Sequence, residues 1–265
     1  MSIFSNEALK NKHIIITGAS GGIGRATVEV IASMGAKITA SGRNTEKLKK
    51  LIEDYPGYDI AIVEADINKP QDRQALVDIA IKTHGPIFGL VNSAGTAGGG
   101  FGRQEVEHVD EELLTNVMHT NWTATVLLTQ LVYKEMIKQK DGAIVNISSL
   151  SGLRGRYGAS AYVSSKFALI GFTQSLALEA IEHRIRVNAV CPGYVETEMG
   201  QSAILSSSQR NGLSYEEQLE KIKTDIPSSE IINPIEVANT VAFLLTNATN
   251  NIIGESIKIS GGAVL

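Results

Sequence analysis

The sequence predicts a single α/β domain in which helices cover both faces of a parallel sheet. Short runs rich in Ile and Val alternate with longer stretches that have a helical spacing of apolar residues. The runs lack the strict two-residue alternation of a half-exposed sheet, so both faces are expected to be covered. A length of 265 residues also suits one α/β domain.

In the first half of the chain, four predicted strands are separated by three predicted helices. Residues 13–16 form an apolar run that stops at Thr17, and apolar residues with helical spacing follow from 22 to 34. The remaining elements are, in order, a strand at 37–40, a helix at 45–54 with one apolar face, a strand at 60–64, a helix at 70–83 and a strand at 87–91.

In the second half the alternation has a longer period. The predicted elements are a long helical stretch at 109–139, a strand at 143–147, a helix at 161–183, a strand at 185–190, a helix at 235–245 begun after Pro234, and a strand at 256–259. Two stretches stand apart, a glycine-rich loop at 97–102 and an insert at 194–233. A connection as long as the insert is usually functional or mobile, so we expect it to form a mobile substrate lid.

Composition and charge narrow the class of protein. Hydrophobic residues make up 43% and charged residues 20% of the chain, which is typical of a globular domain. A net charge of −4 gives no electrostatic reason to expect a nucleic-acid partner. The single cysteine, Cys191, excludes an internal disulfide and suits a reducing compartment. The polar start and the lack of an apolar run of about 18 residues predict a cytoplasmic protein without a signal peptide or membrane span.

A glycine cluster directly after the first predicted strand indicates a nucleotide site. Its glycines would let the chain turn tightly and approach a pyrophosphate, and the following helix would offer N–H groups at its start. The spacing G-x-x-x-G-x-G departs from the commoner G-x-G-x-x-G, so a plain strand-to-helix turn is the alternative. The residues expected at this site are Gly18, Ser20, Gly21, Gly22, Ile23 and Gly24.

The end of the second predicted strand favours NADP(H) over NAD. A fold that prefers NAD places Asp or Glu there, whereas this chain has Arg43 and no acid in the segment 41–44. Arg43 can pair with a 2′-phosphate; the alternative is a solvated loop arginine. After the third strand, Asp66 could either cap the next helix or hydrogen-bond adenine. No metal site is expected.

Tyr162 and Lys166 indicate carbonyl chemistry. They stand four residues apart and therefore share a helix face. A ketone reduced by hydride develops alkoxide charge and needs a proton, which a tyrosine can donate, and a nearby ammonium is expected to lower the tyrosine pKa. Ser149 could polarise the carbonyl, and Ser148 is the competing candidate. Adjacent strand-end residues face opposite sides, so only one of the two serines should serve. Asn121 is a poor interior helix residue that could hold a water, or it could be a surface polar residue.

Together these residues resemble the short-chain dehydrogenase/reductase family. The resemblance covers nearly the whole chain in family order and rests on Thr17 with Gly18 to Gly24, Asn92-Ser93-Ala94-Gly95, Asn121, Ser149, Tyr162 with Lys166, and Pro192-Gly193 with Thr197. It implies one doubly wound, Rossmann-type domain with the strand order 3-2-1-4-5-6-7. It also implies that Asn121, Ser149, Tyr162 and Lys166 form a catalytic tetrad. Ser93 stands where Asn is more usual.

The resemblance further implies the contacts to cofactor and substrate. The additional cofactor residues are Ile67, Asn92, Ala94, Gly95, Pro192, Gly193, Val195 and Thr197, together with Asp66, Tyr162 and Lys166. The expected substrate residues are Gly98, Gly99, Ser151, Leu153, Tyr157, Tyr194 and Met199. A homotetramer or homodimer is expected through the helices at 109–139 and 161–183, because the second carries surplus apolar residues: Phe167, Ile170, Phe172, Leu176 and Leu178.

Within that family, the chain is similar to ketoreductases of polyketide and fatty-acid synthesis. The segment 188–199 and the glycines at 98–100 carry this similarity, although Ala97 stands where a proline usually precedes the paired glycines. The expected function is NADPH-dependent reduction of a ketone, first a carrier-bound β-ketoacyl or polyketide chain. The alternatives are a free small alcohol or ketone, such as a sugar or steroid, and a catalytically idle NADP(H)-binding sensor.

Overall fold

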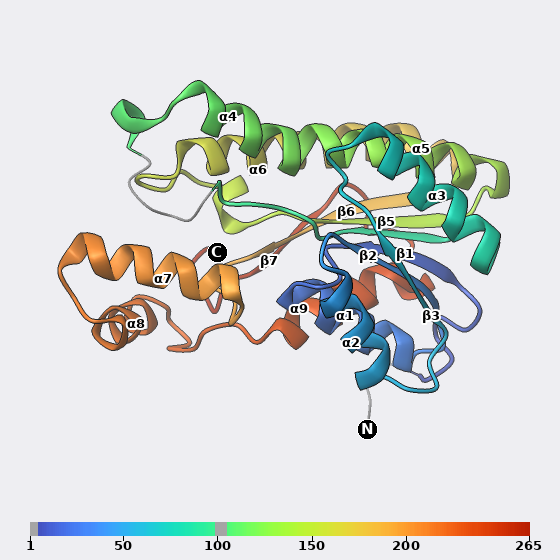
Figure 1. Ribbon diagram of the computed structural model, residues 1–265, viewed down its shortest axis with the longest axis horizontal. Helices are drawn as coiled ribbons and strands as arrows, with labels where there is room; N and C mark the ends of the chain where they lie inside the picture. The colour runs from blue at the N-terminus through green and yellow to red at the C-terminus, as the bar shows by residue number, and fades with distance from the viewer. Residues whose placement is uncertain (1–4, 99–104) are drawn as a thin grey trace.

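Seven parallel strands form one sheet in the order β3-β2-β1-β4-β5-β6-β7 (Figure 1). This computed structural model describes residues 5–98 and 105–265. The strands are β1 (His13–Thr17), β2 (Lys37–Gly42), β3 (Ile60–Glu64), β4 (Gly89–Asn92), β5 (Gly142–Ile147), β6 (Ile185–Pro192) and β7 (Ser256–Ile259). The predicted fold class and strand order are confirmed.

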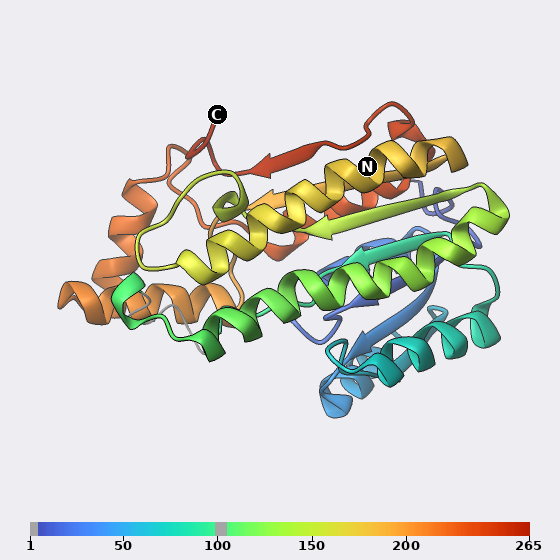
Figure 2. The same cartoon turned by 90° about the horizontal axis from the view of Figure 1, so that it is seen from above.

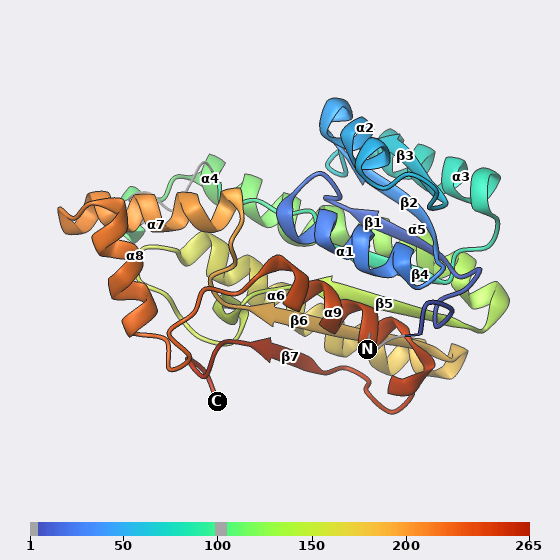
Figure 3. The ribbon, with the colours of Figure 1, turned by 90° about the horizontal axis from the view of Figure 1, so that it is seen from below.

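Helices cover both faces of the sheet, as expected for strands that are apolar on both sides (Figures 1 and 3). One face carries α1 (Gly22–Ser33), α2 (Thr45–Asp54) and α9 (Pro234–Leu245). The other carries α3 (Pro70–His84), α5 (Ala124–Gln139) and α6 (Ser160–Ala180). Each layer closes its own core against the sheet, with Ile14 and Val28 in the first core and Ile15 and Leu128 in the second.

The helix predicted at 109–139 is interrupted, and that prediction is wrong in one respect. The chain forms α4 (Glu111–Met118), a π-helical turn over His119–Thr123, and then α5. A single π turn inside a helix is frequently found at a functional site. Here it contains Asn121, which is buried.

The insert at 194–233 contains two helices rather than an extended loop. These are α7 (Glu198–Asn211), which was not predicted from the sequence, and α8 (Tyr215–Thr224), where the stretch 216–223 has a helix-compatible sequence. Ile204 of α7 packs against Ile222 of α8. Both helices lie at the end of the molecule toward which the strands point (Figures 1 and 2).

No helix in the described part of the chain combines the length and apolar character that crossing a bilayer requires.

Candidate active site at the carboxyl ends of the strands

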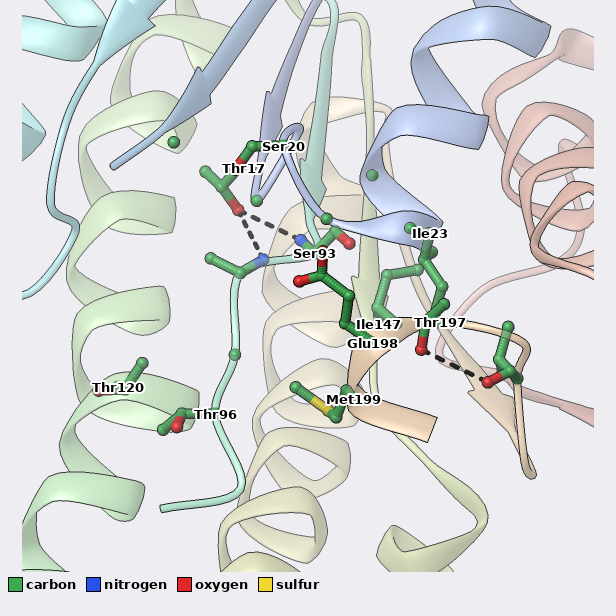
Figure 4. Close-up of a pocket in the computed structure, with 18 of the residues that line it drawn as sticks. Thr17, Ser20, Ile23, Ser93, Thr96, Thr120, Ile147, Thr197, Glu198 and Met199 are labelled. Atoms are coloured by element: carbon green, nitrogen blue, oxygen red, sulfur yellow. Dashed lines mark hydrogen bonds between the residues drawn. The ribbon is translucent and has the colours of Figure 1, made fainter. Parts of the chain in front are cut away.

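A cavity of about 780 Å³ opens at the carboxyl ends of the strands (Figure 4). This is the edge where doubly wound sheets bind ligands. Twenty residues predicted from the sequence line it: Gly18, Ser20, Gly21, Gly22, Ile23, Gly24, Arg43, Asp66, Ile67, Ala94, Gly95, Ser149, Tyr162, Lys166, Pro192, Gly193, Tyr194, Val195, Thr197 and Met199.

The turn between β1 and α1 needs glycine for two different reasons. Gly18 has a φ of +65°, and a Cβ there would lie 2.8 Å from the backbone nitrogen of Ala94. A Cβ on Gly24 would overlap the carbonyl oxygen of Gly18, so α1 can start this close to the turn only without a side chain. The start of α1 is therefore a bare backbone surface facing the cavity.

Thr17 fastens this turn to the end of β4. Its hydroxyl oxygen accepts hydrogen bonds from the backbone nitrogens of Ser93 and Ala94, each at 3.2 Å (Figure 4). The ends of β1 and β4 are thus joined and together form the base of the cavity. Asn92 faces away from this base: its side-chain amide donates to Thr129 and Asn146. Asn92, which was expected to contact the cofactor, is absent from the cavity lining, and its side chain links β4 to β5 and α5.

The outer end of the cavity fits a phosphorylated adenosine. Arg43 lines it from the end of β2 and is exposed. The neighbouring Ser41 hydroxyl is buried and has no hydrogen-bond partner among the described residues. Asp66 does not cap α3, because its carboxylate accepts from the backbone nitrogen of Asn68 at 3.1 Å and the N-cap of α3 is Lys69. The buried Ser41 hydroxyl could hydrogen-bond a dinucleotide, and the glycine turn between β1 and α1 leaves space for its phosphates.

Tyr162 and Lys166 project from α6 into the inner end of the cavity, and both are buried. The Lys166 ammonium donates to the Ile147 carbonyl at 2.9 Å and lies 5.6 Å from the centroid of the Tyr162 ring. Burial lowers the pKa of the Lys166 ammonium to about 8. The Tyr162 phenol and the Lys166 ammonium thus lie on the same face of α6, as the four-residue spacing predicts.

The expected cause of the Tyr162 pKa shift needs correction. Burial raises the pKa of Tyr162, and the groups that oppose this rise are the hydrogen-bonded Ser149 side chain and the positive charge of Arg156. The Lys166 ammonium is directed to the Ile147 carbonyl. The phenol therefore keeps its proton at neutral pH and is held ready as an acid.

The two adjacent serines have different partners. The Ser149 hydroxyl bonds Tyr162 and accepts from the Ser151 backbone nitrogen at 3.0 Å. The Ser148 hydroxyl instead donates to the backbone carbonyl of Lys166 at 3.2 Å. The geometry favours Ser149 as the group beside the reacting carbonyl.

Asn121 lies behind the cavity wall and connects it to α6. Its Nδ2 donates to the Thr96 carbonyl and to the Ser165 hydroxyl, at 2.9 and 3.0 Å. A Cβ on Gly95 would lie 3.2 Å from Asn121 Oδ1 and 3.6 Å from Lys166 Nζ. The glycine thus keeps the space between these two polar groups open, which suits a water.

Four predicted substrate residues lie elsewhere. Gly98 is absent from the cavity lining, and a Cβ on it would meet Leu113 and Val117. Leu153 packs against the cluster that contains Ile170 and Cys191. The remaining two are Ser151, buried in the turn Leu150–Gly152, and Tyr157, which is 79% exposed on the loop before α6. Gly99 falls outside the described residues.

Arg156, Lys47 and Glu198 also line the cavity and were not predicted from the sequence. Arg156 stands six residues before Tyr162, and this proximity to the predicted acid was the available signal. Lys47 of α2 and Glu198 of α7 form an ion pair at 2.6 Å. Nothing in their sequence positions, 151 residues apart, indicates that they meet.

Comparisons with known proteins agree with this geometry. A family model described as "short chain dehydrogenase" matches residues 12–206. The chain is 37% identical over 259 residues to the 3-oxoacyl-acyl-carrier-protein reductase FabG of Aquifex aeolicus (strain VF5), covering 96% of this chain and 98% of that protein.

Two solved structures have the same fold. A crystal structure of a variant of actinorhodin polyketide ketoreductase with NADPH superposes with a TM-score of 0.91 at 31% identity and covers 95% of this chain and 97% of that one. The crystal structure of levodione reductase gives a TM-score of 0.89 at 28% identity, with 96% and 98% covered.

Proposed function

The chain belongs to the short-chain dehydrogenase family, and from this premise we propose that it is an NADPH-dependent carbonyl reductase. Its first proposed substrate is a β-ketoacyl or polyketide chain bound to an acyl carrier protein, in line with the names of the relatives. The observation that carries the proposal is that Ser149, Tyr162 and Lys166 line the same cavity as the bare glycine turn.

NADPH, when bound, supplies the hydride that a ketone accepts. The glycine turn and the start of α1 would hold its pyrophosphate, and Arg43 its 2′-phosphate. Ile67, Ala94 and Gly95 would border the adenosine and ribose, and Pro192, Gly193, Val195 and Thr197 the nicotinamide end.

Residues of the chain would orient the ketone carbonyl and supply the proton. Ser149 orients the carbonyl oxygen, and Tyr162 donates its phenol proton to the alkoxide as a general acid. Because burial raises the pKa of Tyr162, the phenol is fully protonated at neutral pH. We propose that Lys166 holds the ribose and that Asn121 keeps a relay water beside Gly95.

The test is turnover. Purified protein is mixed with NADPH and a panel of ketones, namely a 3-oxoacyl thioester, a cyclic diketone and a simple ketone, and NADPH absorbance is followed. Consumption that depends on the ketone supports the reductase. No consumption with any ketone, combined with tight NADPH binding, would leave the idle sensor as the better account.

A free small ketone is the second candidate. The observation in its favour is the likeness to levodione reductase over nearly the whole chain. A higher kcat/KM on a free cyclic diketone than on a carrier-bound 3-oxoacyl group would select this candidate. NADH in place of NADPH serves as the cofactor control.

We also propose a homo-oligomer, a dimer or tetramer, in the cytoplasm. Of the apolar residues that motivated this, Ile170 and Leu176 are buried in the cores, whereas Phe167 is 45% and Leu178 is 76% exposed. Leu127 of α5 is also exposed, and α5 and α6 run side by side (Figure 2). Light scattering at micromolar concentration tests the assembly, with Leu178→Lys as the disrupting variant; a monomeric mass would contradict it.

A further inference from the structure

A guanidinium group is fixed in the wall of the cavity beside Tyr162. Arg156 lies on the loop that leads into α6, is half-buried, and lines the cavity. Its Nη2 donates to the hydroxyl of Tyr194 at 2.6 Å, and its Cζ lies 5.1 Å from the centroid of the same ring. Hydrogen bonding combined with stacking on one aromatic side chain orients the planar fork.

Arg156 is linked to Tyr162 through Tyr194, because the Tyr194 ring that holds the guanidinium packs against the apolar cluster that contains Tyr162. The positive charge of Arg156, like the Ser149 hydroxyl, lowers the pKa of the Tyr162 phenol. All three groups line the same cavity, in which Ser149 and Tyr162 would hold the oxygen of the ketone being reduced.

We propose that Arg156 recognises a second oxygen of the substrate, the carbonyl or carboxylate oxygen two carbons away from the reacting ketone. This rests on the proposed function and narrows its substrate class to 3-oxo acids and their thioesters. A guanidinium carries five N–H donors in a fixed fork, so Arg156 can hold Tyr194 and also donate to a substrate oxygen. In a 3-oxo compound the two oxygens can lie on the same side of the carbon chain, within reach of Tyr162 and Arg156 together.

The inference predicts a loss that depends on the substrate. A hydrogen bond from a charged donor typically changes kcat/KM by about 10- to 100-fold. Arg156→Gln should therefore lose about 10- to 100-fold on acetoacetyl-CoA and on acetoacetate, and should lose far less on cyclohexanone, which has no second oxygen. Arg156→Lys, which keeps the charge but not the fork, should recover part of the activity on acetoacetate.

The two oxygen sources are separated by the same assay. If a carboxylate is the recognised group, Arg156→Gln loses more activity on acetoacetate than on acetoacetyl-CoA; if a thioester carbonyl is recognised, the losses are similar or reversed. Arg154→Gln is the matched control, because exposed Arg154 lies two residues away, donates to the Ala263 carbonyl at 3.3 Å and does not line the cavity. Thermal unfolding of each variant without substrate verifies that the fold is kept.

Two results would overturn the inference alone. One is an equal loss by Arg156→Gln on all three ketones, which would indicate a general effect on Tyr162; the other is no loss on either 3-oxo compound. A wild-type protein that reduces no ketone at all would instead overturn the proposed function on which the inference depends.

Discussion

Asn121 holds the backbone of Thr96 by a pair of hydrogen bonds, accepting from the Thr96 nitrogen at 2.7 Å and donating to the Thr96 carbonyl at 2.9 Å. The side-chain amide thus pairs with one residue as a neighbouring strand would. It ties the π-helical turn to the loop after β4, and through Ser165 it also reaches α6.

Asn121→Asp should disturb this link in a measurable way. A carboxylate cannot donate to the Thr96 carbonyl, and the two oxygens would repel each other, so the free energy of unfolding should fall by about 1–3 kcal/mol. Urea unfolding measures the change. Asn116→Asp, at an exposed position of α4, is the control and should stay within about 0.5 kcal/mol. Equal effects of the two variants would contradict the structural role of Asn121.

Tyr162→Phe removes the hydroxyl and keeps the ring. Because Tyr162 is proposed to donate the proton, kcat should fall at least about 100-fold, the usual contribution of a general acid. NADPH binding, followed by fluorescence titration, should be retained. Tyr157→Phe is the matched control, since that exposed side chain lies outside the cavity lining. Near-normal turnover by Tyr162→Phe would remove it from the proton-donor role.

Arg43→Asp should reverse the cofactor preference. An acid at the end of β2 repels a 2′-phosphate and can accept from a ribose hydroxyl instead. The ratio of kcat/KM for NADPH to that for NADH is the quantity to measure. Lys50→Asp, on exposed α2 and outside the cavity lining, is a control for the change in net charge. An unchanged ratio would make Arg43 an ordinary surface residue.

Because of His13, the free energy of unfolding should decrease as the pH falls. It is 1% exposed, its ring nitrogens bond Gly85 and Thr39, and burial lowers its pKa from 6.5 to about 4. Between these two pH values the unfolded chain binds more protons than the folded chain. The free energy of unfolding should therefore be highest above pH 6.5 and fall by up to about 1.4 kcal/mol per pH unit toward pH 4.

Urea unfolding across this pH range measures the slope. His13→Gln should flatten the slope whatever its absolute stability, and His108→Gln, at an exposed position, should leave it as it is. If both variants keep the wild-type slope, other groups cause the acid sensitivity.

The insert at 194–233 is proposed to act as a mobile substrate lid, and hydrogen exchange tests its motion. Amides at 200–224 should exchange faster than those of α6 in the free protein and slow when NADPH and a bulky ketone are bound. Ion pairing of Glu198 with Lys47 places the start of α7 against α2, so Glu198→Gln should speed exchange at the start of α7. The amides of α9 serve as the internal reference. Equal protection with and without ligands would show a rigid cap.

The strands were the most predictable part of the fold. The ranges predicted for β3 and β7 match the structure, and the others differ by one or two residues at an end. Buried parallel strands are set by local apolar runs, which a sequence displays directly. The spacing of Tyr162 and Lys166 was predictable for the same reason, because a helix fixes it locally.

The features that were not predicted from the sequence depend on contacts between residues far apart in the chain. The π-helical turn contains Asn121, whose side chain pairs with Thr96, 25 residues earlier in the chain. Helix α7 is rich in serine, so a search for apolar residues with helical spacing does not detect it. Its ends are nevertheless defined by Thr197 at the N-cap and by Gly212, in a left-handed conformation, at the C-cap. The directions of the Leu153 and Tyr157 side chains depend on the conformation of the loop before α6, which the local sequence pattern does not predict.

The strand order has a consequence for synthesis of the chain. Strands β2 and β3, and later β5, β6 and β7, each pair with the strand that precedes them, whereas β4 returns across the sheet to β1. One edge of β1 therefore stays open until β4 has left the ribosome, and Ile14 pairing with Gly89 closes the longest stretch of chain in the sheet. The proposed cofactor would cover this same seam, since Gly18 and Ala94 both line the cavity. A ligand that binds only the closed seam should lower the population of nascent chains with an exposed edge, and so reduce their aggregation.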